Sequence, residues 1–311
     1  TPYTYNIMSG GISSDSTSIN AKYKTIATAN GRAYLGNLKY TDETGSNIIA
    51  GDAMLKTPVN AFDTHLKENL SEVSINDGDE IICLHSFADR ILQYKKQNVY
   101  VINISQELEF IENVFYNRGV SIPTAVTKTS SGVAWVNASG VYLYNGEQML
   151  DLFVNNGKRV ISRQDWKDFL VADGADSGTG ETALNPEIYY LPKNKELLVY
   201  SDSGAAGSNI ESRYAMLYSM TNQAWSYLSK DDSDRDFITG KTNSVLDSNN
   251  DLAFCQGTTK DIKVWADKAV VSSNFKLITK DYDFESPGVR KKIYKVYITY
   301  KTADSGSVVS N

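Results

Sequence analysis

The sequence predicts an all-β fold, and three observations support this prediction. The chain of 311 residues contains 20 Tyr but only 6 Pro, and aromatic side chains pack well on the pleated surface of a sheet. Short apolar runs alternate along the chain with clusters of Gly, Asn, Asp and Ser, as strands alternate with turns. One arrangement of turn, strand, turn and strand also recurs. A divergent, strand-only repeat of this size is typical of a β-propeller, here of about five to seven blades.

The recurring unit begins with a turn of small and polar residues and continues with two strands. Its four copies are Ala88–Arg90 with Ile91–Tyr94 and Val99–Ile104, Ser131–Gly132 with Val133–Val136 and Val141–Tyr144, Lys193–Asn194 with Leu197–Tyr200 and Tyr214–Tyr218, and Ser248–Asn250 with Leu252–Cys255 and Ile262–Trp265. The spacing between successive turns equals or exceeds the roughly 40 to 50 residues of a typical blade. We therefore expect irregular loop insertions between the strands.

The N-terminal part contains a candidate fifth copy. Residues 1–22 include a stretch rich in Ser and Gly, and we expect them to form an arm or linker. Two strands, Tyr23–Ala29 and Ala33–Leu38, then flank Asn30-Gly31. Asn-Gly supplies the positive φ angles of a type I′ turn, so this segment predicts a β-hairpin.

Strands inside the repeats are apolar at consecutive positions, as Val99–Ile102 and Val141–Tyr144 illustrate. Such strands are buried on both faces, which the face-to-face packing of radial blades achieves without covering helices. The best helix candidate is Ser162–Leu170, where Ser162 can cap the N-terminus and Asp165 follows three residues later. One short helix in a loop leaves the fold class unchanged.

The C-terminal part predicts a last strand, Lys291–Lys301, in which tyrosine and aliphatic residues alternate with lysine and threonine. We divide the chain into an arm or linker at 1–22, a β-propeller at 23–285 and a segment at 286–311 in which this strand leads into a further β module. Because the chain begins at Thr1 and stops soon after that strand, we expect it to be a fragment of a longer protein.

Charge and cysteine content exclude several classes of protein. The formal net charge of −6 argues against a protein that grips nucleic acid, because neutralising phosphates requires an excess of Lys and Arg. The two cysteines, Cys83 and Cys255, lie in separate apolar runs, and we expect two buried thiols rather than a disulfide framework. No apolar run approaches the roughly 18 residues that a membrane-spanning helix needs.

Two acidic segments have the composition of weak cation sites. The segment Asp247–Asp251 matches the start of a calcium-binding loop, but Leu252 and Thr258 stand where that loop needs Gly and Glu. A polar hairpin turn is the better interpretation. The run Asp231–Asp236 is expected to be a solvated loop.

Catalytic and zinc-binding patterns are incomplete. Cys83 and His85 share one face of a strand, but zinc takes four ligands and no second Cys/His pair lies within range. His65 and His85 are the two histidines, and neither neighbours a nucleophile motif. The segment Ser201–Gly204 does not complete the box that marks sialidase blades. We expect no enzymatic activity, no metal and no cofactor, although 37 acidic residues leave a diverged glycosidase open as a third alternative.

The tryptophans allow a carbohydrate-binding interpretation as the leading alternative. Aromatic rings can stack on sugars, and the four candidates are Trp135, Trp166, Trp225 and Trp265. Three of them lie within or beside the repeated strands, where we favour a role in the core between blades. A lectin propeller would also be expected to repeat its binding residues from blade to blade.

Three stretches of the sequence resemble tail proteins of short-tailed bacteriophages (podoviruses). They are Phe87–Lys95 continuing through Val99–Asn103, then Gly119–Pro123 with Ser131–Gly146, and Pro287–Tyr294. The close match covers about residues 77–150 and 281–301, and it resembles the virion structural proteins of marine podoviruses. A more distant similarity extends to the tail nozzle (tail tubular protein B) and to tail-hub propellers.

This resemblance implies a structural protein of the virion. It suggests a β-propeller subunit in a ring of copies, expected to be a hexamer, below the portal and adaptor, where the ring forms the channel for DNA ejection. The family offers no catalytic residues to carry over. An acidic chain suits a channel through which DNA passes without specific binding.

Overall fold

The computed structural model describes residues 21–41, 45–73, 78–106, 108–170, 186–201, 213–229, 241–256 and 262–265, together with Arg290, Lys292 and Lys295. The chain divides into two compact units, 1–268 and 269–311, and every described strand belongs to the first unit. Most of the predicted arm 1–22 and, apart from those three residues, the predicted segment 286–311 with its strand lie outside the described residues.

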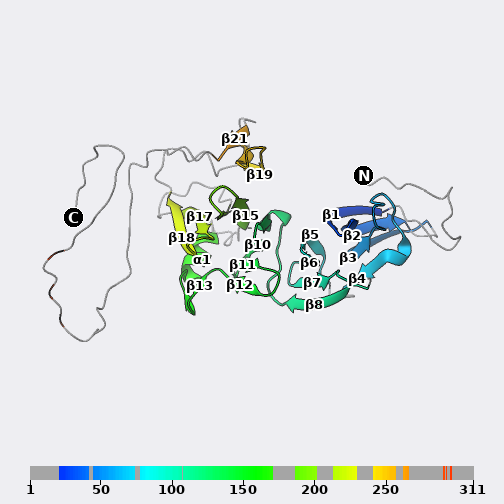
Figure 1. Ribbon diagram of the computed structural model, residues 1–311, viewed down its shortest axis with the longest axis horizontal. Helices are drawn as coiled ribbons and strands as arrows, with labels where there is room; N and C mark the ends of the chain where they lie inside the picture. Colours follow the sequence, from blue (N-terminus) through cyan, green and yellow to red (C-terminus); the bar gives the residue numbers. More distant parts are fainter. Residues whose placement is uncertain are drawn as a thin grey trace, which may run out of the picture. The chain divides into compact units, whose positions relative to one another are not determined.

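The described part of the first unit consists of successive antiparallel sheets, each built from strands in chain order (Figure 1). Sheet 1 comprises β1 (Ala21–Ala29), β2 (Arg32–Thr41), β3 (Asn47–Lys56) and β4 (Leu70–Glu72), and sheet 2 comprises β5 (Ile81–Phe87), β6 (Arg90–Lys95), β7 (Val99–Asn103) and β8 (Phe110–Phe115). Sheet 3 comprises β9 (Val126–Thr129), β10 (Gly132–Asn137), β11 (Gly140–Tyr144) and β12 (Met149–Asp151), and sheet 4 comprises β15 (Pro186–Leu191), β16 (Glu196–Ser201), β17 (Arg213–Ser219) and β18 (Ala224–Ser229). Sheet 5 comprises β19 (Lys241–Leu246), β20 (Leu252–Gln256) and β21 (Ile262–Val264). Four-stranded meanders in series are the blades of a β-propeller, so the predicted fold class is confirmed.

Each of the four predicted repeats corresponds to the second and third strands of one sheet, and the candidate fifth copy corresponds to the first and second strands of sheet 1. The turn at the start of each repeat joins the first strand of that sheet to the second, in all five sheets. The Asn30-Gly31 turn occupies this position in sheet 1, with φ angles of 50° and 69°, and Ala29 pairs with Arg32 across it. The candidate fifth copy is therefore a blade, and its hairpin prediction is confirmed.

An insertion separates sheets 3 and 4. It contains a small hairpin of β13 (Val154–Asn155) and β14 (Lys158–Arg159), followed by α1 (Arg163–Leu170). Ser162 caps this helix: the backbone N–H of Asp165 donates to the Ser162 hydroxyl at 3.0 Å, and that hydroxyl donates to the Asp165 carboxylate at 2.7 Å. The helix prediction is confirmed, and the insertion accounts for part of the irregular spacing of the repeats. Two 3-10 turns, η1 (Lys67–Asn69) and η2 (Pro123–Ala125), complete the described elements.

Neighbouring sheets pack in chain order, largely through their first strands. Between sheets 1 and 2, the Leu84 backbone N–H donates to the Thr25 hydroxyl at 3.0 Å. Between sheets 3 and 4, the hydroxyls of Ser130 and Tyr190 lie 3.0 Å apart. Because each sheet covers a face of the next, apolar side chains are buried on both sides of the strands.

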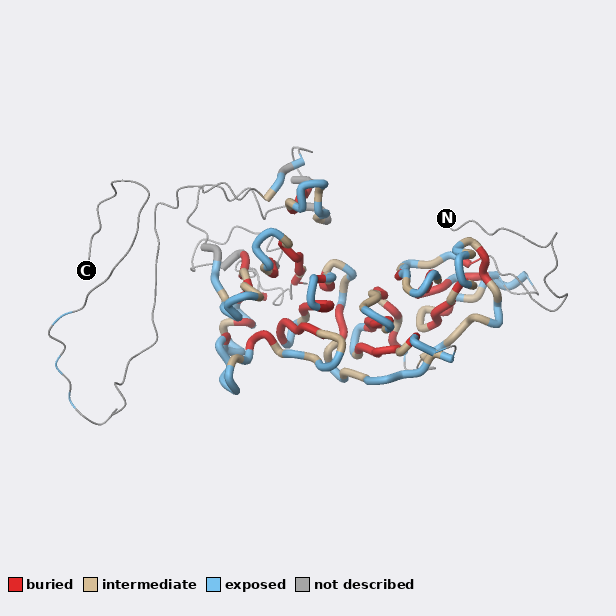
Figure 2. The backbone as a smooth tube through the Cα atoms, in the orientation of Figure 1, coloured by how far each residue is buried: buried red, intermediate tan, exposed pale blue. Residues whose placement is uncertain are grey.

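The largest buried cluster extends over sheets 2, 3 and 4 (Figure 2). Val99 and Val101 of β7 point into this cluster, whereas Ile102 of the same strand points into a second cluster shared with sheet 1. In β11, every residue from Gly140 to Tyr144 is buried. The prediction that these strands are buried on both faces is confirmed.

Candidate functional site

The Cys83–His85 pair lies on β5 and faces sheet 3. Cys83 is buried, and burial raises the pKa of its thiol, so the thiol remains protonated and is neither a good nucleophile nor a good ligand. His85 is half-buried, with its ring edge-on to Tyr94 at 6.1 Å between centroids. Burial, with a smaller effect of Lys128, lowers the pKa of His85 to about 4. Both side chains contribute to packing between sheets 2 and 3.

The structure keeps the two histidines apart, on different sheets. His65 lies in the loop between β3 and β4 of sheet 1 and is almost fully buried, and burial lowers its pKa. Its Nδ1 atom has no hydrogen-bond partner, nor does the hydroxyl of the adjacent Thr64. Across the described ranges, no group of three or more His, Cys, Asp or Glu is placed to hold a metal ion.

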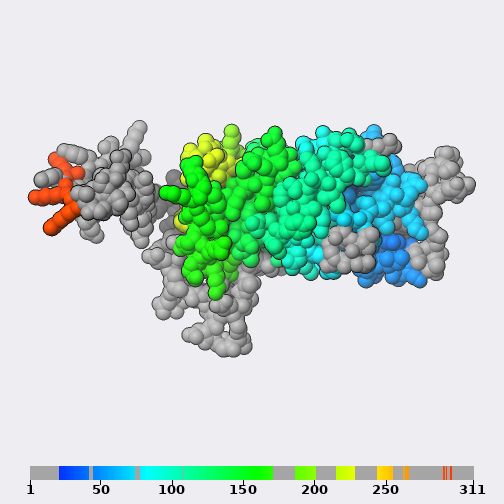
Figure 3. All heavy atoms as spheres, turned by 90° about the horizontal axis from the view of Figure 1, so that it is seen from below, coloured from blue at the N-terminus to red at the C-terminus, as the bar shows by residue number. Residues whose placement is uncertain are grey.

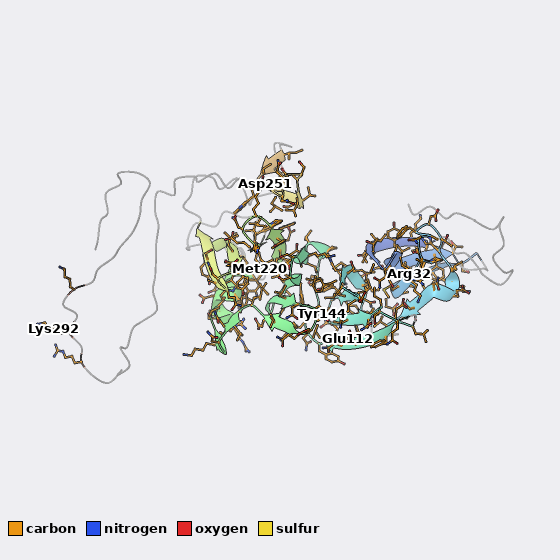
Figure 4. All side chains as sticks on the ribbon, in the orientation of Figure 1. Arg32, Glu112, Tyr144, Met220, Asp251 and Lys292 are labelled. Atoms are coloured by element: carbon orange, nitrogen blue, oxygen red, sulfur yellow. The ribbon has the colours of Figure 1, made fainter. Side chains whose placement is uncertain are left out.

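The Asp247–Asp251 segment forms the polar hairpin turn between β19 and β20. The Asp247 carboxylate accepts the backbone N–H groups of Asn249 and Asp251, both at 2.8 Å. The Asp251 carboxylate accepts from Lys193 Nζ at 2.6 Å (Figure 4 labels Asp251). These oxygens are thus used to close a turn and to connect sheets 4 and 5, and the hairpin interpretation is confirmed. The run Asp231–Asp236 lies outside the described residues.

The tryptophans are used for packing between and beside the sheets. Trp135 and Trp166 are buried, and Trp225 and Trp265 are half-buried. Three indole N–H groups donate to backbone carbonyls: Trp135 to Arg118 at 2.8 Å, Trp166 to Ala138 at 3.0 Å and Trp225 to Leu152 at 2.8 Å. The core role is confirmed for Trp135, whereas Trp225 and Trp265 pack against the borders of buried clusters.

A cluster that the sequence did not indicate lies between sheets 4 and 5. The hydroxyl of Tyr189 donates to a Glu187 carboxylate oxygen at 2.9 Å, and the Tyr200 hydroxyl donates to the same oxygen. The two rings stack with centroids 5.7 Å apart. The Tyr189 hydroxyl also accepts the Ser244 backbone N–H at 3.4 Å, which connects sheet 5 to the cluster. Glu187 and Tyr200 are paired across β15 and β16, so only strand register brings them together.

A carboxylate between two phenols could suggest nucleophilic catalysis, but the electrostatics oppose it. Burial, followed by the charge of Glu187, raises the pKa of Tyr189. A phenol with a raised pKa stays protonated at neutral pH and is a weak nucleophile. Tyr200 is also fully buried and out of reach of a substrate. The cluster therefore acts as a joint between sheets.

Ion pairs connect sheets 1 and 2 at their periphery. Lys56 Nζ and a Glu109 oxygen lie 2.9 Å apart, and both side chains are largely buried. Glu80 accepts from Asn37 at 2.9 Å and pairs with Lys24 and Lys96 at 3.0 and 3.1 Å. The hydrogen bond from Asn37, with those from the two lysines, lowers the pKa of Glu80 to about 2. These charged groups connect sheets 1 and 2.

Among the described helices, none is long and apolar enough to cross a membrane. No protein-family model matches the chain, and no curated protein matches it in sequence.

Several solved structures resemble the chain. YCF48 bound to D1 peptide has a TM-score of 0.40 at 8% identity, with 78% of this chain and 66% of that chain covered. The Dos1 propeller has a TM-score of 0.40 at 9% identity, covering 80% and 63%. The WD40 domain of SCAP from fission yeast has a TM-score of 0.35 at 10% identity, covering 78% and 59%. The chain spans less than two thirds of the length of each of these structures.

Proposed function

We propose that this chain is a structural subunit of the tail of a short-tailed bacteriophage, a nozzle or hub propeller without catalytic activity. Copies of it form a ring, expected to be a hexamer, below the portal and adaptor, and DNA passes through the ring during ejection. The chain is accordingly a component of the virion. The resemblance in sequence motivates this proposal, and the position of the resembling residues in the fold supports it.

One observation carries the proposal. Two of the three stretches through which the sequence resembles phage tail proteins, those within 87–103 and 119–146, meet at the joint between sheets 2 and 3; the third, Pro287–Tyr294, lies outside the described residues apart from Arg290 and Lys292. A Cβ atom at Gly119 would lie 2.2 Å from the Lys95 carbonyl oxygen, so this backbone lies directly against the end of β6. Asn137 donates to the Gly119 carbonyl at 2.9 Å, and Tyr94 packs on Trp135 with ring centroids 5.5 Å apart.

A shared set of packing residues is the signature expected of a structural family. A family of enzymes or lectins would preserve a set of exposed polar or aromatic groups around a pocket. Here the resembling residues form strands, turns and buried aromatic contacts, so their role is to pack and not to bind or react with a ligand. The net charge of −6 adds a second argument, because an acidic chain does not retain the phosphates of passing DNA.

Reconstruction of virions that carry this chain tests the proposal. We expect copies of the chain to surround the tail axis between the adaptor and the distal tip. Copies located only on lateral fibres, or a channel whose lining from this chain is strongly basic, would refute it. Binding of the purified chain to a glycan array, lost when one tryptophan is replaced, would instead favour the carbohydrate-binding alternative.

A further inference from the structure

An arginine without a carboxylate partner packs against sheet 3. Arg118 follows β8 in the chain, and its guanidinium carbon lies 4.8 Å from the centre of the Tyr142 ring in β11. Its Nη1 donates to the Asn117 carbonyl at 3.2 Å. Within the described part of the chain its buried Nε has no hydrogen-bond partner, and no carboxylate pairs with it. A guanidinium stacked on a ring in this way keeps an N–H edge that can donate to an anion.

The hydroxyl of Tyr142 is a second donor at the same place. Only 1% of this residue is exposed, yet its hydroxyl forms no hydrogen bond with any described residue. A buried tyrosine hydroxyl usually has a hydrogen-bond partner. Burial raises the pKa of Tyr142, and the positive charges of Arg118 and Arg159 partly oppose this effect. The phenol therefore stays protonated at neutral pH and keeps a proton to donate to a ligand.

The insertion after sheet 3 brings a second guanidinium to this hydroxyl. A Cβ atom at Gly140 would lie 3.1 Å from the Tyr142 hydroxyl oxygen and 3.4 Å from the Phe153 ring, so these two groups flank the same position. The Arg159 guanidinium carbon lies 5.2 Å from the centre of the Phe153 ring. The three donor groups come from the segment after β8, from β11 and from the β13–β14 hairpin, and the tertiary structure brings them together.

One carboxylate borders these donors without neutralising them. Asp151 pairs with Tyr142 across β11 and β12, and one of its oxygens accepts the Phe153 backbone N–H at 2.9 Å. Its other oxygen lies 3.9 Å from Arg159 Nη1, which is too far for a hydrogen bond. The Nε of Arg159 donates to the Ile161 carbonyl at 2.8 Å, and its terminal N–H groups remain available. Two guanidiniums against one carboxylate leave one positive charge in excess.

The group of donors opens to the surface. The side chains of Arg159 and Asp151 are each 29% exposed, and Arg118 is half-buried. In Figure 3, the green atoms of sheet 3 and of the insertion that follows it lie at the surface of the molecule. An anion can therefore reach the N–H edges of the two guanidiniums while the ring of Tyr142 stays buried.

We propose that Arg118, Arg159 and the hydroxyl of Tyr142 form a binding site for one phosphate group. The planar fork of a guanidinium matches the spacing of phosphate oxygens. Three separate donor groups can each bind a different oxygen of a tetrahedral anion, whereas a carboxylate has two oxygens. The phosphate is either a free anion or the phosphodiester of a larger molecule. This site goes beyond the proposed function, which assigns no ligand to the chain.

Isothermal titration calorimetry with three anions at equal ionic strength tests the site. Inorganic phosphate represents the free anion, dimethyl phosphate represents a phosphodiester, and acetate is the carboxylate control. The variants are Arg118→Gln and Tyr142→Phe, and the matched control is Arg163→Gln, at an exposed arginine of α1. Circular dichroism confirms that each protein is folded.

We expect one phosphate to bind per chain, with the same affinity in the unmodified protein and in Arg163→Gln. Arg118→Gln should weaken binding by at least about tenfold, because it removes a charged donor. Tyr142→Phe should weaken it by about three- to tenfold, because it removes a neutral one. Binding of inorganic phosphate alone would assign the site to a free anion, and binding of dimethyl phosphate as well would assign it to a phosphodiester.

Three results would overturn the site: phosphate that does not bind, phosphate that binds every variant equally, and phosphate that binds no more tightly than acetate. A further variant covers the case in which a change at Arg118 or Tyr142 prevents folding. Arg159→Gln alters a partly exposed side chain of the hairpin and should also weaken phosphate binding by at least about tenfold. Unchanged affinity in that variant would contradict the site as well.

Discussion

Individual residues at the sheet joints are selected for shape and for hydrogen bonds at fixed positions. Trp135 illustrates this: it is fully buried, its ring contacts Tyr94 and Tyr142, both with centroids 5.5 Å away, and its N–H group reaches a backbone carbonyl. A buried tryptophan needs apolar neighbours for its ring and a hydrogen-bond acceptor for its N–H group, so it fits only where both are present. Such a residue stabilises the fold and is unavailable to a ligand.

Replacing Trp135 by Ala should therefore be severely destabilising. We expect a loss of about 3 to 5 kcal/mol in the free energy of unfolding, because the change leaves a cavity and removes a buried hydrogen bond. Urea denaturation followed by circular dichroism measures it. Tyr116→Ala, at an exposed aromatic residue, is the control and should change stability by less than about 0.5 kcal/mol. Equal effects of the two changes would contradict the central position of Trp135.

His85 should make the stability of the fold depend on pH. Its pKa of about 4 in the folded state lies below the ordinary value of 6.5, so the unfolded chain binds more protons between these two values. Stability is then complete above pH 6.5 and declines as the pH falls towards 4, by at most about 3 kcal/mol. His85→Gln should flatten this decline in denaturation curves recorded from pH 7 to 4. An unchanged slope in the variant would show that His85 is solvated.

At the scale of elements, the turns and backbone crossings determine how neighbouring strands meet. Gly119 lies directly against the Lys95 and Lys96 carbonyls, where a Cβ atom would clash with backbone. Gly157, in the β13–β14 turn, has a φ of 74° but nothing within 4 Å of the position of a Cβ atom. Gly119 is therefore required because the backbones approach closely, whereas Gly157 is required only because its φ angle is positive.

Gly119→Ala should destabilise the chain more than Gly157→Ala. The first change forces the segment that contains Gly119 away from the end of β6, and we expect a loss of more than about 2 kcal/mol in the free energy of unfolding. The second strains only a local φ angle and should cost about 1 kcal/mol. Thermal unfolding of both variants measures the difference. Similar midpoints would indicate that the crossing at Gly119 adjusts without cost.

Helix α1 depends on its cap. Ser162→Ala removes the acceptor of the Asp165 N–H group, and we expect a loss of about 1 kcal/mol, within the usual range for N-cap residues. Ser162→Asp keeps an acceptor and should restore most of the stability. Chemical denaturation of the three proteins provides the comparison, and an alanine variant as stable as the original would exclude a role for the cap.

At the scale of the whole molecule, the joints between sheets differ in composition. The cluster shared by sheets 2, 3 and 4 is large and rich in aromatic residues. In the cluster between sheets 4 and 5, Leu252 is the buried residue that sheet 5 contributes. That joint also uses the Lys193–Asp251 ion pair and the Ser244–Tyr189 hydrogen bond. Joints with fewer apolar contacts open at lower free energy.

Hydrogen exchange should follow this difference. We expect amides of β10 and β11 to exchange only on global unfolding, whereas those of β20 exchange through local opening and at least about tenfold faster. Mass spectrometry of peptides from each sheet measures the rates. Asp251→Asn should increase exchange in sheet 5 and leave sheet 3 unchanged. Uniform protection across the sheets would show that the joints open together.

Prediction from the sequence succeeded for the second and third strands of sheets 2 to 5, for the first and second strands of sheet 1, and for the turn between the first and second strands of each sheet. In sheets 2 and 3 the second and third strands are buried on both faces, so their apolar runs are continuous and distinct. The outer strands were not predicted, because β8 is largely exposed and β12 has only 3 residues, which leaves little apolar pattern. The Glu187 joint was also missed, since its members are paired only through strand register.

The sequence alone determined the class of fold, the positions of the turns and the burial of the central strands, because each depends on local pattern. Tertiary structure decided what the polar and aromatic candidates do. Trp135 could have bound a sugar and Asp247 a cation, but contacts between distant segments assign one to a joint and the other to a turn. Those contacts depend on sheet packing and register, which no local stretch of sequence contains.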